Sequence, residues 1–305
     1  MTQLFYNNID ITNKIDIKKC VLHDYAGNGA DDAEIVFPDS EKLWGKWNPQ
    51  RGDSIVIKSE SYSTGLMYLD SIVKSAGIFT LKAISTPISA KKTKNRIWRN
   101  IKFSEIISDI AKNNSLEFET YGITEYTYSA LSQCGQTDIG FLNDICIREG
   151  YCCKVTNGKL IVFSEAYMES QLSKITITSD DLYPEYDFQL SDDVFQNFTV
   201  LYYGSELITY TANDNTIVGG SDRRIEYLTN VGEAERWSKG YLRNKNKYRK
   251  TAWLPIKYLA DVAAASVITI DGFSNFDGKY YIYKITHDTV NNRSYLLVRQ
   301  TIEKY

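Results

Sequence analysis

The sequence predicts an α+β, mainly β fold in which two small β-barrel-like domains flank a central small α/β unit. Short alternating apolar runs separated by turn residues fill residues 1–88. The apolar spacing changes to that of helices in residues 103–170, and the strand pattern returns in residues 171–305. A chain of 305 residues is long enough for about two domains.

The first domain, residues 1–88, is expected to hold five to seven short strands. Ala26-Gly27-Asn28-Gly29 predicts a turn, because glycine and asparagine tolerate positive φ. Pro38 ends one apolar run and Pro87 closes the domain. The expected strands include residues 18–22, 33–37, 54–58, 66–69 and 78–81.

A basic connector is expected at residues 89–102, SAKKTKNRIWRNIK, which contain six lysine or arginine residues. A helix follows, with Ser104 as its N-cap and Asn113-Asn114 at its end. Its apolar face is predicted to comprise Phe103, Ile106, Ile107, Ile110 and Ala111.

The rest of the central unit, which spans residues 103–170, is predicted from its helix caps and one turn. Thr137 caps a helix over residues 138–149, and Gly150 occupies the position where glycine usually ends a helix. Asn157-Gly158 then predicts a hairpin of residues 151–155 and 160–163.

The second β-barrel-like domain, residues 171–305, includes one helix near residues 231–242. The helix is predicted from Asn230 and Glu233, which are spaced as in a capping box. The expected strands are residues 175–177, 188–190, 195–203, 207–210, 267–270, 279–286 and 295–299.

Composition argues against several classes of function. A net charge of −3 gives no general attraction to nucleic acid or to anionic membranes. The 23 tyrosines suit half-buried strands and protein interfaces. The N-terminus shows no signal peptide, no apolar run is long enough for a membrane span, and the five cysteines are expected to be reduced. We therefore expect synthesis in the cytoplasm.

No catalytic or metal-binding motif is evident, so the sequence predicts a non-enzymatic protein without a cofactor or metal. His23 and His287 are the only histidines, and neither CxxC nor HExxH occurs. A glycan hydrolase using adjacent aspartates stays as an alternative. So does a receptor- or carbohydrate-binding protein. Their candidate residues are Asp31-Asp32, Asp180-Asp181 and Asp192-Asp193 for the first, and Trp44, Trp47 and Tyr62 for the second.

Two basic runs combine cations with aromatic residues, a pattern that also occurs in proteins that bind nucleic acid. A solvated surface is the favoured interpretation, and a patch that docks an acidic partner subunit fits equally well. The cations that we name as interface candidates are Lys91, Lys92, Lys94, Arg96, Arg99, Lys239, Arg243, Lys245 and Lys247.

Three segments together resemble the phage late-control D family. The central one is LSQCGQTDIGFLNDICIREGYCCKVTNGKLIVF, which follows the helix of residues 103–114. The flanking ones are ADDAEIVFPDS with WNPQRGDSIVIKS, and FDGKYYIYKITHDTVNNRSYLLVRQ. The family includes the T-even baseplate hub, the hubs of phage-tail-like (R-type) bacteriocins and the VgrG spike of type VI secretion. The matching residues, expected to serve packing, are Gln133, Gln136, Asp138, Phe141, Leu142, Glu149, Gly150, Tyr151, Gly278, His287 and Tyr295.

The resemblance implies a homotrimeric baseplate hub of a contractile tail or injection particle. Each subunit would bring two similar β-barrel domains, so that a pseudo-sixfold ring joins a hexameric tail tube to a trimeric spike. Other baseplate proteins would be partners, and the spike is expected on a separate polypeptide. The ring would surround a lumen, which makes the cations of the two basic runs candidates for lumen charges as well. The sequence leaves open whether the lumen carries DNA, a tape-measure protein or neither. The expected location is the virion or particle baseplate, after synthesis in a bacterial host.

Overall fold

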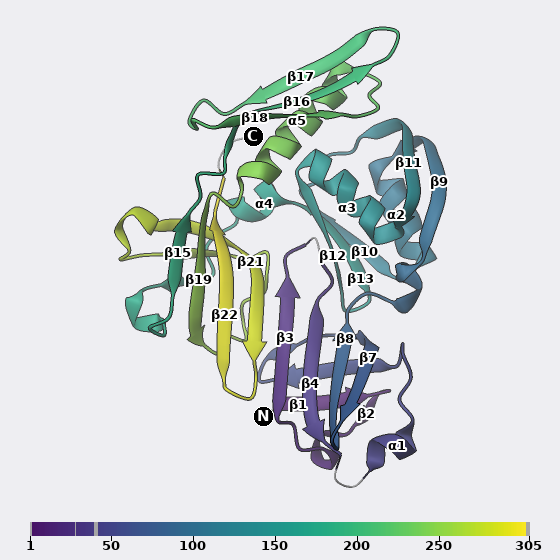
Figure 1. The fold of residues 1–305 in the computed structure, drawn as a ribbon, viewed down its shortest axis with the longest axis vertical. Helices are drawn as coiled ribbons and strands as arrows, with labels where there is room; N and C mark the ends of the chain where they lie inside the picture. The colour runs from purple at the N-terminus through teal and green to yellow at the C-terminus, as the bar shows by residue number, and fades with distance from the viewer. Residues whose placement is uncertain (1, 28, 40–41, 303–305) are drawn as a thin grey trace.

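The computed structural model describes residues 2–27, 29–39 and 42–302 (Figure 1). Strands dominate, as the predicted α+β, mainly β class requires, and this class is confirmed. The elements of the first β block are β1 (Thr2–Tyr6), β2 (Ile9–Asp10), β3 (Lys19–Tyr25), β4 (Asp32–Pro38), α1 (Leu43–Trp47), β5 (Ser54–Ser59), β6 (Tyr62–Ser63), β7 (Met67–Ser75) and β8 (Ile78–Ile84). Asn28 of the predicted turn lies outside the described residues.

One sheet of fourteen strands runs through both predicted β-barrel-like domains. Its main path has the order β15-β19-β22-β21-β3-β4-β8-β7-β5-β1-β2. The two halves meet where β21 (Gly278–Asp288) pairs antiparallel with β3, with His287 opposite Leu22. Among the described residues the pairing closes no barrel, so the two β blocks are halves of one open sheet.

Alternation along the strands builds the core of the first block. In β4, Ala33, Ile35 and Phe37 are buried and their neighbours are partly exposed, as expected for a strand with one face on a core. Trp44 of α1 covers this core, with its ring centroid 4.9 Å from that of Phe37.

The predicted basic connector is wrong for most of residues 89–102. A short 3₁₀ turn, η2 (Ile88–Lys91), leads into strand β9 (Thr93–Lys102), which pairs antiparallel with β11 (Thr127–Thr137). Trp98 is buried while Ile97 is exposed, so the strand has one face on the core and one in solvent. Long cationic side chains can lie along such a strand because their charged ends reach water.

The two helices and the hairpin of the central unit are confirmed. Thr137 accepts a hydrogen bond from Gly140 N at 3.1 Å, and Gly150 ends α3 with φ of 72°. The N-cap of α2 is Lys102 rather than Ser104, and Glu105 accepts a hydrogen bond from the Lys102 main chain. The elements are α2 (Phe103–Asn113), β10 (Glu117–Tyr121), α3 (Asp138–Glu149), β12 (Tyr151–Thr156), β13 (Lys159–Ser164) and α4 (Glu165–Ser170).

The C-terminal part combines the second half of the main sheet with a separate small sheet. Helix α5 (Val231–Asn246) begins as predicted, since Asn230 accepts a hydrogen bond from Glu233 N at 2.9 Å, but it runs past residue 242. It packs beneath the three-stranded sheet β17-β16-β18 (Figure 1). The strands are β14 (Thr176–Ile177), β15 (Asp187–Leu190), β16 (Phe195–Tyr203), β17 (Leu207–Asn213), β18 (Gly220–Ile225), β19 (Lys250–Lys257), β20 (Val267–Ile270), β21 and β22 (Arg293–Gln300).

Among the described helices, none has the length and apolar character that a membrane span needs.

Candidate assembly surfaces and buried junctions

Two cations of the first basic run are held by carboxylates of the same chain. Lys91 lies 2.7 Å from Asp70, and Arg96 lies 2.7 Å from Asp109. Surface pairs of this kind leave little net charge for a partner. The exposed cations of the run include Lys92, Arg99 and Lys102.

The structure corrects the second basic run at two positions. Arg243 and Lys247, expected to face an interface or a lumen, are each only 4% exposed. Their side chains point into the molecule, where acidic groups bind them. The other two lysines of the run lie at the surface in ion pairs, Lys239 with Glu235 at 2.6 Å and Lys245 with Asp222 at 2.9 Å.

Arg243 and Lys247 belong to a buried cluster of three cations and two carboxylates. Glu169 Oε1 lies 2.6 Å from a guanidinium nitrogen of Arg243 and 2.6 Å from one of Arg299. Glu165 Oε1 lies 3.0 Å from Lys247 Nζ and 3.3 Å from Arg299. The carboxylates come from α4, two cations from the end of α5 and Arg299 from β22. The cluster therefore ties the central unit to the main sheet.

Opposite charges dominate the electrostatics of this cluster. Burial alone raises the pKa of Glu165, but Lys247, Arg299 and Arg243 outweigh burial and hold that pKa well below its usual range. For Arg299, burial acts to lower the pKa, and Glu165 and Glu169 raise it above its usual value. Glu165 and Arg299 therefore stay charged at neutral pH.

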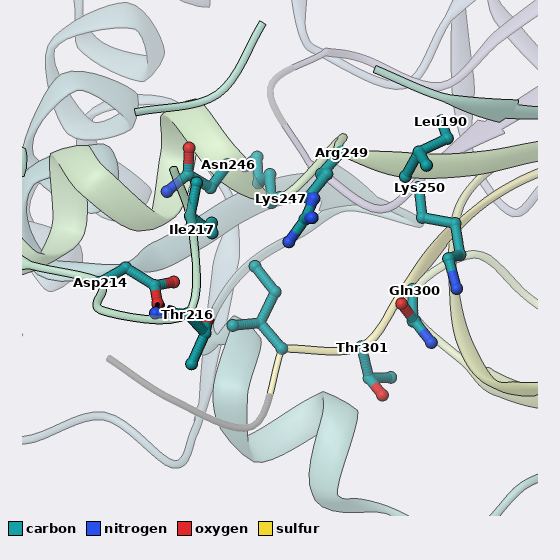
Figure 2. Close-up of a pocket in the computed structure, with 11 residues that line it drawn as sticks. Leu190, Asp214, Thr216, Ile217, Asn246, Lys247, Arg249, Lys250, Gln300 and Thr301 are labelled. Atoms are coloured by element: carbon teal, nitrogen blue, oxygen red, sulfur yellow. Dashed lines mark hydrogen bonds between the residues drawn. The ribbon is translucent and has the colours of Figure 1, made fainter. Parts of the chain in front are cut away.

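A hollow of about 450 Å³ adjoins the cluster, between the end of β15, the β17–β18 loop, the end of α5 and the end of β22 (Figure 2). Lys247 and Arg249 both line it, and Figure 2 shows the Arg249 side chain reaching into it. Lys250 Nζ donates a hydrogen bond to the main-chain carbonyl of Asn275 at 2.7 Å.

A second buried junction joins the first β block to the central hairpin. Lys154 of β12 forms an ion pair with Asp24 of β3 and lies 3.2 Å from Asp31. Asp24 also accepts a hydrogen bond from Ala264 N at 2.8 Å, which brings in the loop before β20. Burial raises the pKa of Asp31 to about 6; Lys154 opposes this rise and Asp24 adds to it. The pair of Asp24 and Lys154 thus links three parts of the chain.

The motif residue Asp138 organises a third junction, at the start of α3. Its carboxylate accepts hydrogen bonds from Lys94 Nζ at 2.5 Å, Asn114 Nδ2 at 3.0 Å and Gln133 Nε2 at 3.0 Å. Burial acts to raise the pKa of Asp138, and these three donors together lower it below its usual value. Lys94, expected as an interface or lumen charge, therefore binds a carboxylate of its own chain.

The other central motif residues also serve packing. Phe141 stacks on Trp98 with ring centroids 5.9 Å apart, and Tyr151 on Phe103 at 5.8 Å. Gln136 donates to Asp144 at 2.6 Å, and Leu142 is buried. Glu149 accepts hydrogen bonds that link α3 to α5, from Trp237 Nε1 at 2.8 Å and Arg236 Nε at 3.0 Å.

His287 lies where the two halves of the main sheet meet. It is fully buried between the rings of Tyr62 and Tyr258, at centroid distances of 4.6 and 5.2 Å. Its Nδ1 is 2.9 Å from Ser294 Oγ. Burial lowers the pKa of His287 to about 4, with partial opposition from Asp24. Of the other closing-segment residues, Gly278 has φ of 132° and Tyr295 stacks on Trp253 at 5.8 Å.

The aspartate pairs of the hydrolase alternative are engaged in turns and ion pairs. Asp31 contacts Lys154, and Asp181 accepts a hydrogen bond from Thr178 N at 2.8 Å. The main-chain N–H of Asp193 donates a hydrogen bond to Ser191 Oγ at 3.1 Å, two residues earlier in the chain, so this pair lies in a turn. In the described part of the chain no three His, Cys, Asp or Glu residues are placed to hold a metal ion.

The aromatic residues of the carbohydrate-binding alternative do not form an exposed platform. Trp44 is 1% exposed and packs against Phe37 and Trp47 in the core of the first block. Tyr62 packs on His287 instead.

Comparison with solved structures finds this fold over nearly the whole chain. The 43 kDa tail protein of prophage MuSo2 from Shewanella oneidensis matches with a TM-score of 0.76 and 10% identity, over 98% of this chain and 97% of that one. The tail protein from Neisseria meningitidis matches with a TM-score of 0.77 and 12% identity, over 98% and 96%. A type VI secretion component of E. coli, described as similar to T4 tail proteins gp27 and gp5, matches with a TM-score of 0.59 and 10% identity, over 99% and 78%.

No family model matches the chain, and no curated protein matches it by sequence. At identities of 9–12% the structural likeness is one of fold. The predicted resemblance to phage tail and type VI secretion proteins is thereby confirmed at the level of the fold.

Proposed function

We propose that the chain is the structural baseplate hub of a contractile phage tail or a tail-like injection particle. A homotrimer of the chain acts as a symmetry adaptor that joins the hexameric tail tube to a trimeric central spike. The match of the complete fold to a phage tail protein, over 98% of this chain and 97% of the other, carries the proposal.

The joined sheet supports the adaptor role. Residues 1–88 and 171–305 supply the two halves of one sheet, linked by the pairing of β3 with β21. Three copies of such a chain present six β units, which suits a sixfold tube, while the trimer itself suits a threefold spike. In this arrangement residues 103–170 form a unit outside the tube-like domains.

The two ends of the main sheet are the proposed contacts between subunits. Strand β15 lies at one end and β2 at the other. Each carries an exposed apolar side chain, Leu190 at 62% and Ile9 at 60%. A head-to-tail contact between such ends closes into a ring, and obligate rings bury apolar surface.

The proposed partners are a second and third copy of the chain, the tail tube protein, a separate spike protein, other baseplate proteins and a tape-measure protein. Synthesis takes place in the cytoplasm of the bacterial host, and the trimer enters the baseplate of the virion or particle. The role requires binding surfaces and no chemistry.

Native mass spectrometry of the purified chain tests this. We expect three times 34.9 kDa, and co-purification with separately produced tube and spike proteins. Leu190→Arg should dissociate the trimer, whereas Leu172→Arg, at a site 89% exposed and outside the strands, should not. A stable monomer that binds neither partner contradicts the proposal.

A further inference from the structure

The hollow beside the Glu165 cluster carries more positive than negative charge (Figure 2). Its lining includes the cations Lys247, Arg249 and Lys250. Asp214 is the one carboxylate among the described lining residues, and it accepts a hydrogen bond from Thr216 N at 2.9 Å within its own loop. A concave site with this balance of charge attracts anions.

Arg249 is the cation of the hollow that has no partner for its side chain. Its main chain is held on both sides, since Arg249 N donates to Asn246 O at 3.0 Å and Arg249 O accepts from Ser191 N at 2.8 Å. The side chain is exposed and reaches into the hollow (Figure 2). In the described part of the chain no hydrogen bond or ion pair engages its guanidinium. An unpaired guanidinium offers parallel N–H donors that suit two oxygens of one oxyanion.

The two lysines of the hollow have partners within the chain. Lys250 Nζ donates a hydrogen bond to the main-chain carbonyl of Asn275 at 2.7 Å, but a carbonyl does not neutralise its charge. An ammonium group also has three N–H donors, so Lys250 keeps donors for a ligand. Lys247 differs, because it forms an ion pair with Glu165 at 3.0 Å and belongs to the buried cluster.

The buried cluster behind the hollow has one more cation than it has carboxylates. Arg243, Lys247 and Arg299 share the carboxylates of Glu165 and Glu169. All five residues are at most 4% exposed, so water and salt screen their charges weakly. The hollow and the cluster together hold five cations and three carboxylates. A ligand with two negative charges would balance them.

Apolar side chains form another part of the walls. Leu190, Ile217 and Ile302 line the hollow together with the charged groups. The volume of about 450 Å³ lies within the range of sites for small organic molecules, about 300–1,000 Å³. A bare oxyanion would leave the apolar walls uncovered, whereas an organic group attached to it would contact them. The lining therefore suits a small molecule with an anionic end and an apolar body.

We propose that the hollow binds a small organic molecule through its phosphate group. Arg249 donates to two phosphate oxygens, Lys250 adds a second cation, and the organic part lies against Leu190, Ile217 and Ile302. A phosphate monoester carries about 1.5 to 2 negative charges at pH 7, which matches the excess of two cations better than a carboxylate does.

This site goes beyond the adaptor role and does not rest on it, because all of its lining residues belong to one chain. Leu190 also belongs to the proposed contact between subunits, so the hollow adjoins that contact. A chain that stays monomeric would still contain the complete site, and failure of the ring is therefore distinguishable from failure of the site.

Isothermal titration calorimetry of the full chain with phenyl phosphate tests the ligand class. Inorganic phosphate lacks the apolar body, and benzoate has the ring but only one negative charge. We expect one phenyl phosphate to bind per chain, and both comparison ligands to bind more weakly. Absence of saturable phenyl phosphate binding, or equal affinity for benzoate, overturns the proposal. Equal affinity for inorganic phosphate assigns the hollow to the free ion and overturns the organic ligand.

Two arginine variants test the location of the site. Arg249→Gln should weaken phenyl phosphate binding by about tenfold, because it removes a charged two-point contact. The fold should persist, since Arg249 is exposed, and melting temperatures check this. Arg223→Gln, at an exposed arginine on β18 outside the hollow, is the matched control and should bind as the wild type does. Equal affinity of Arg249→Gln and the wild type, or an equal loss in Arg223→Gln, overturns the proposal.

Two acidic positions test the balance of charge. Glu165→Gln increases the excess of cations behind the hollow, so this variant should bind phenyl phosphate more tightly than the wild type does. Binding that is no tighter overturns the proposal. Glu303 follows Ile302 in the sequence and lies outside the described residues. Glu303→Gln should leave the affinity unchanged; binding that occurs only in this variant shows that the chain's own acid competes for the hollow and overturns the proposal.

Discussion

Replacing Glu165 with glutamine should destabilise the protein strongly, because it leaves buried cations unbalanced. The variant has the shape of the wild type, but Glu169, which pairs with Arg243 and Arg299, is then the one carboxylate of the cluster. Lys247 loses its ion pair with Glu165. Breaking a buried ion pair by removing one partner costs about 3–5 kcal/mol. Unfolding entropy is about 2.1 cal/mol/K per residue. For 305 residues the melting temperature should fall by about 5–8 °C.

The cluster also predicts an asymmetry between its members. It holds three cations and two carboxylates, so Lys247→Met removes the excess charge and should cost less than Glu165→Gln. Adding Lys247→Met to Glu165→Gln should recover part of the lost stability. Differential scanning calorimetry at pH 7 measures all three variants.

A matched control exists at the surface. Glu119→Gln breaks an exposed pair with Lys159, at 2.6 Å, and should leave the melting temperature unchanged. The pKa of Glu165 lies below its unfolded value of 4.5, so its contribution is complete above that pH and is lost as pH falls below it. If Glu165→Gln behaves like Glu119→Gln at pH 7, the cluster does not hold the units together.

Three further variants test other junctions. Gly240→Ala should destabilise the chain by about 1–3 kcal/mol, since a Cβ there lies 2.1 Å from the main-chain oxygen of Arg148; Gly45→Ala, with open space around it, is the control in urea unfolding. His287→Gln should reduce acid sensitivity: the folded pKa of about 4 lies below the unfolded 6.5, so stability present above pH 6.5 is lost as pH falls toward 4, about 3 kcal/mol in all. Equal acid midpoints for wild type and variant would count against this. Asp31→Asn should change the pH dependence in the opposite direction. The folded pKa of Asp31, about 6, exceeds the unfolded value of 3.8, so the wild type loses stability as pH rises from 4 to 6. The free energy of unfolding measured against pH should not show this loss in the variant.

Local signals made much of the central unit predictable. Thr137 and Gly150 mark the two ends of α3, and both act as the caps that their chemistry suggests. The Asn157-Gly158 turn likewise specified its hairpin, with φ of 46° and 72° at the two residues. These features depend on residues that are close together in the sequence, and they can therefore be predicted from it.

The prediction was wrong where the structure depends on contacts between residues that are far apart in the sequence. Arg243 and Lys247 resemble surface charges because their carboxylates lie in α4, 74–82 residues earlier in the chain. The pairing of β3 with β21 joins segments about 260 residues apart, and periodicity carries no signal for it. Strand β9 was missed because residues 89–102 carry six cations and look like a solvated connector. The alternation of Lys94, Arg96 and Trp98 on one side is nevertheless that of a strand.

The character of the buried junctions bears on the proposed adaptor. Lys154, Asp138 and the Glu165 cluster each connect elements from different parts of the chain through buried charges, beside apolar contacts such as those of Cys152 and Phe163 with the core of the main sheet. Buried ion pairs add little net stability compared with apolar packing, but a misplaced partner is costly because its charge is left unpaired. Such junctions therefore tolerate one relative placement of the units. An adaptor between sixfold and threefold partners depends on that placement more than on extra stability. We infer that the buried charges fix the relative placement of the units and contribute little to stability. A Lys247→Met chain that is as stable as the wild type but fails to trimerise would separate these two roles.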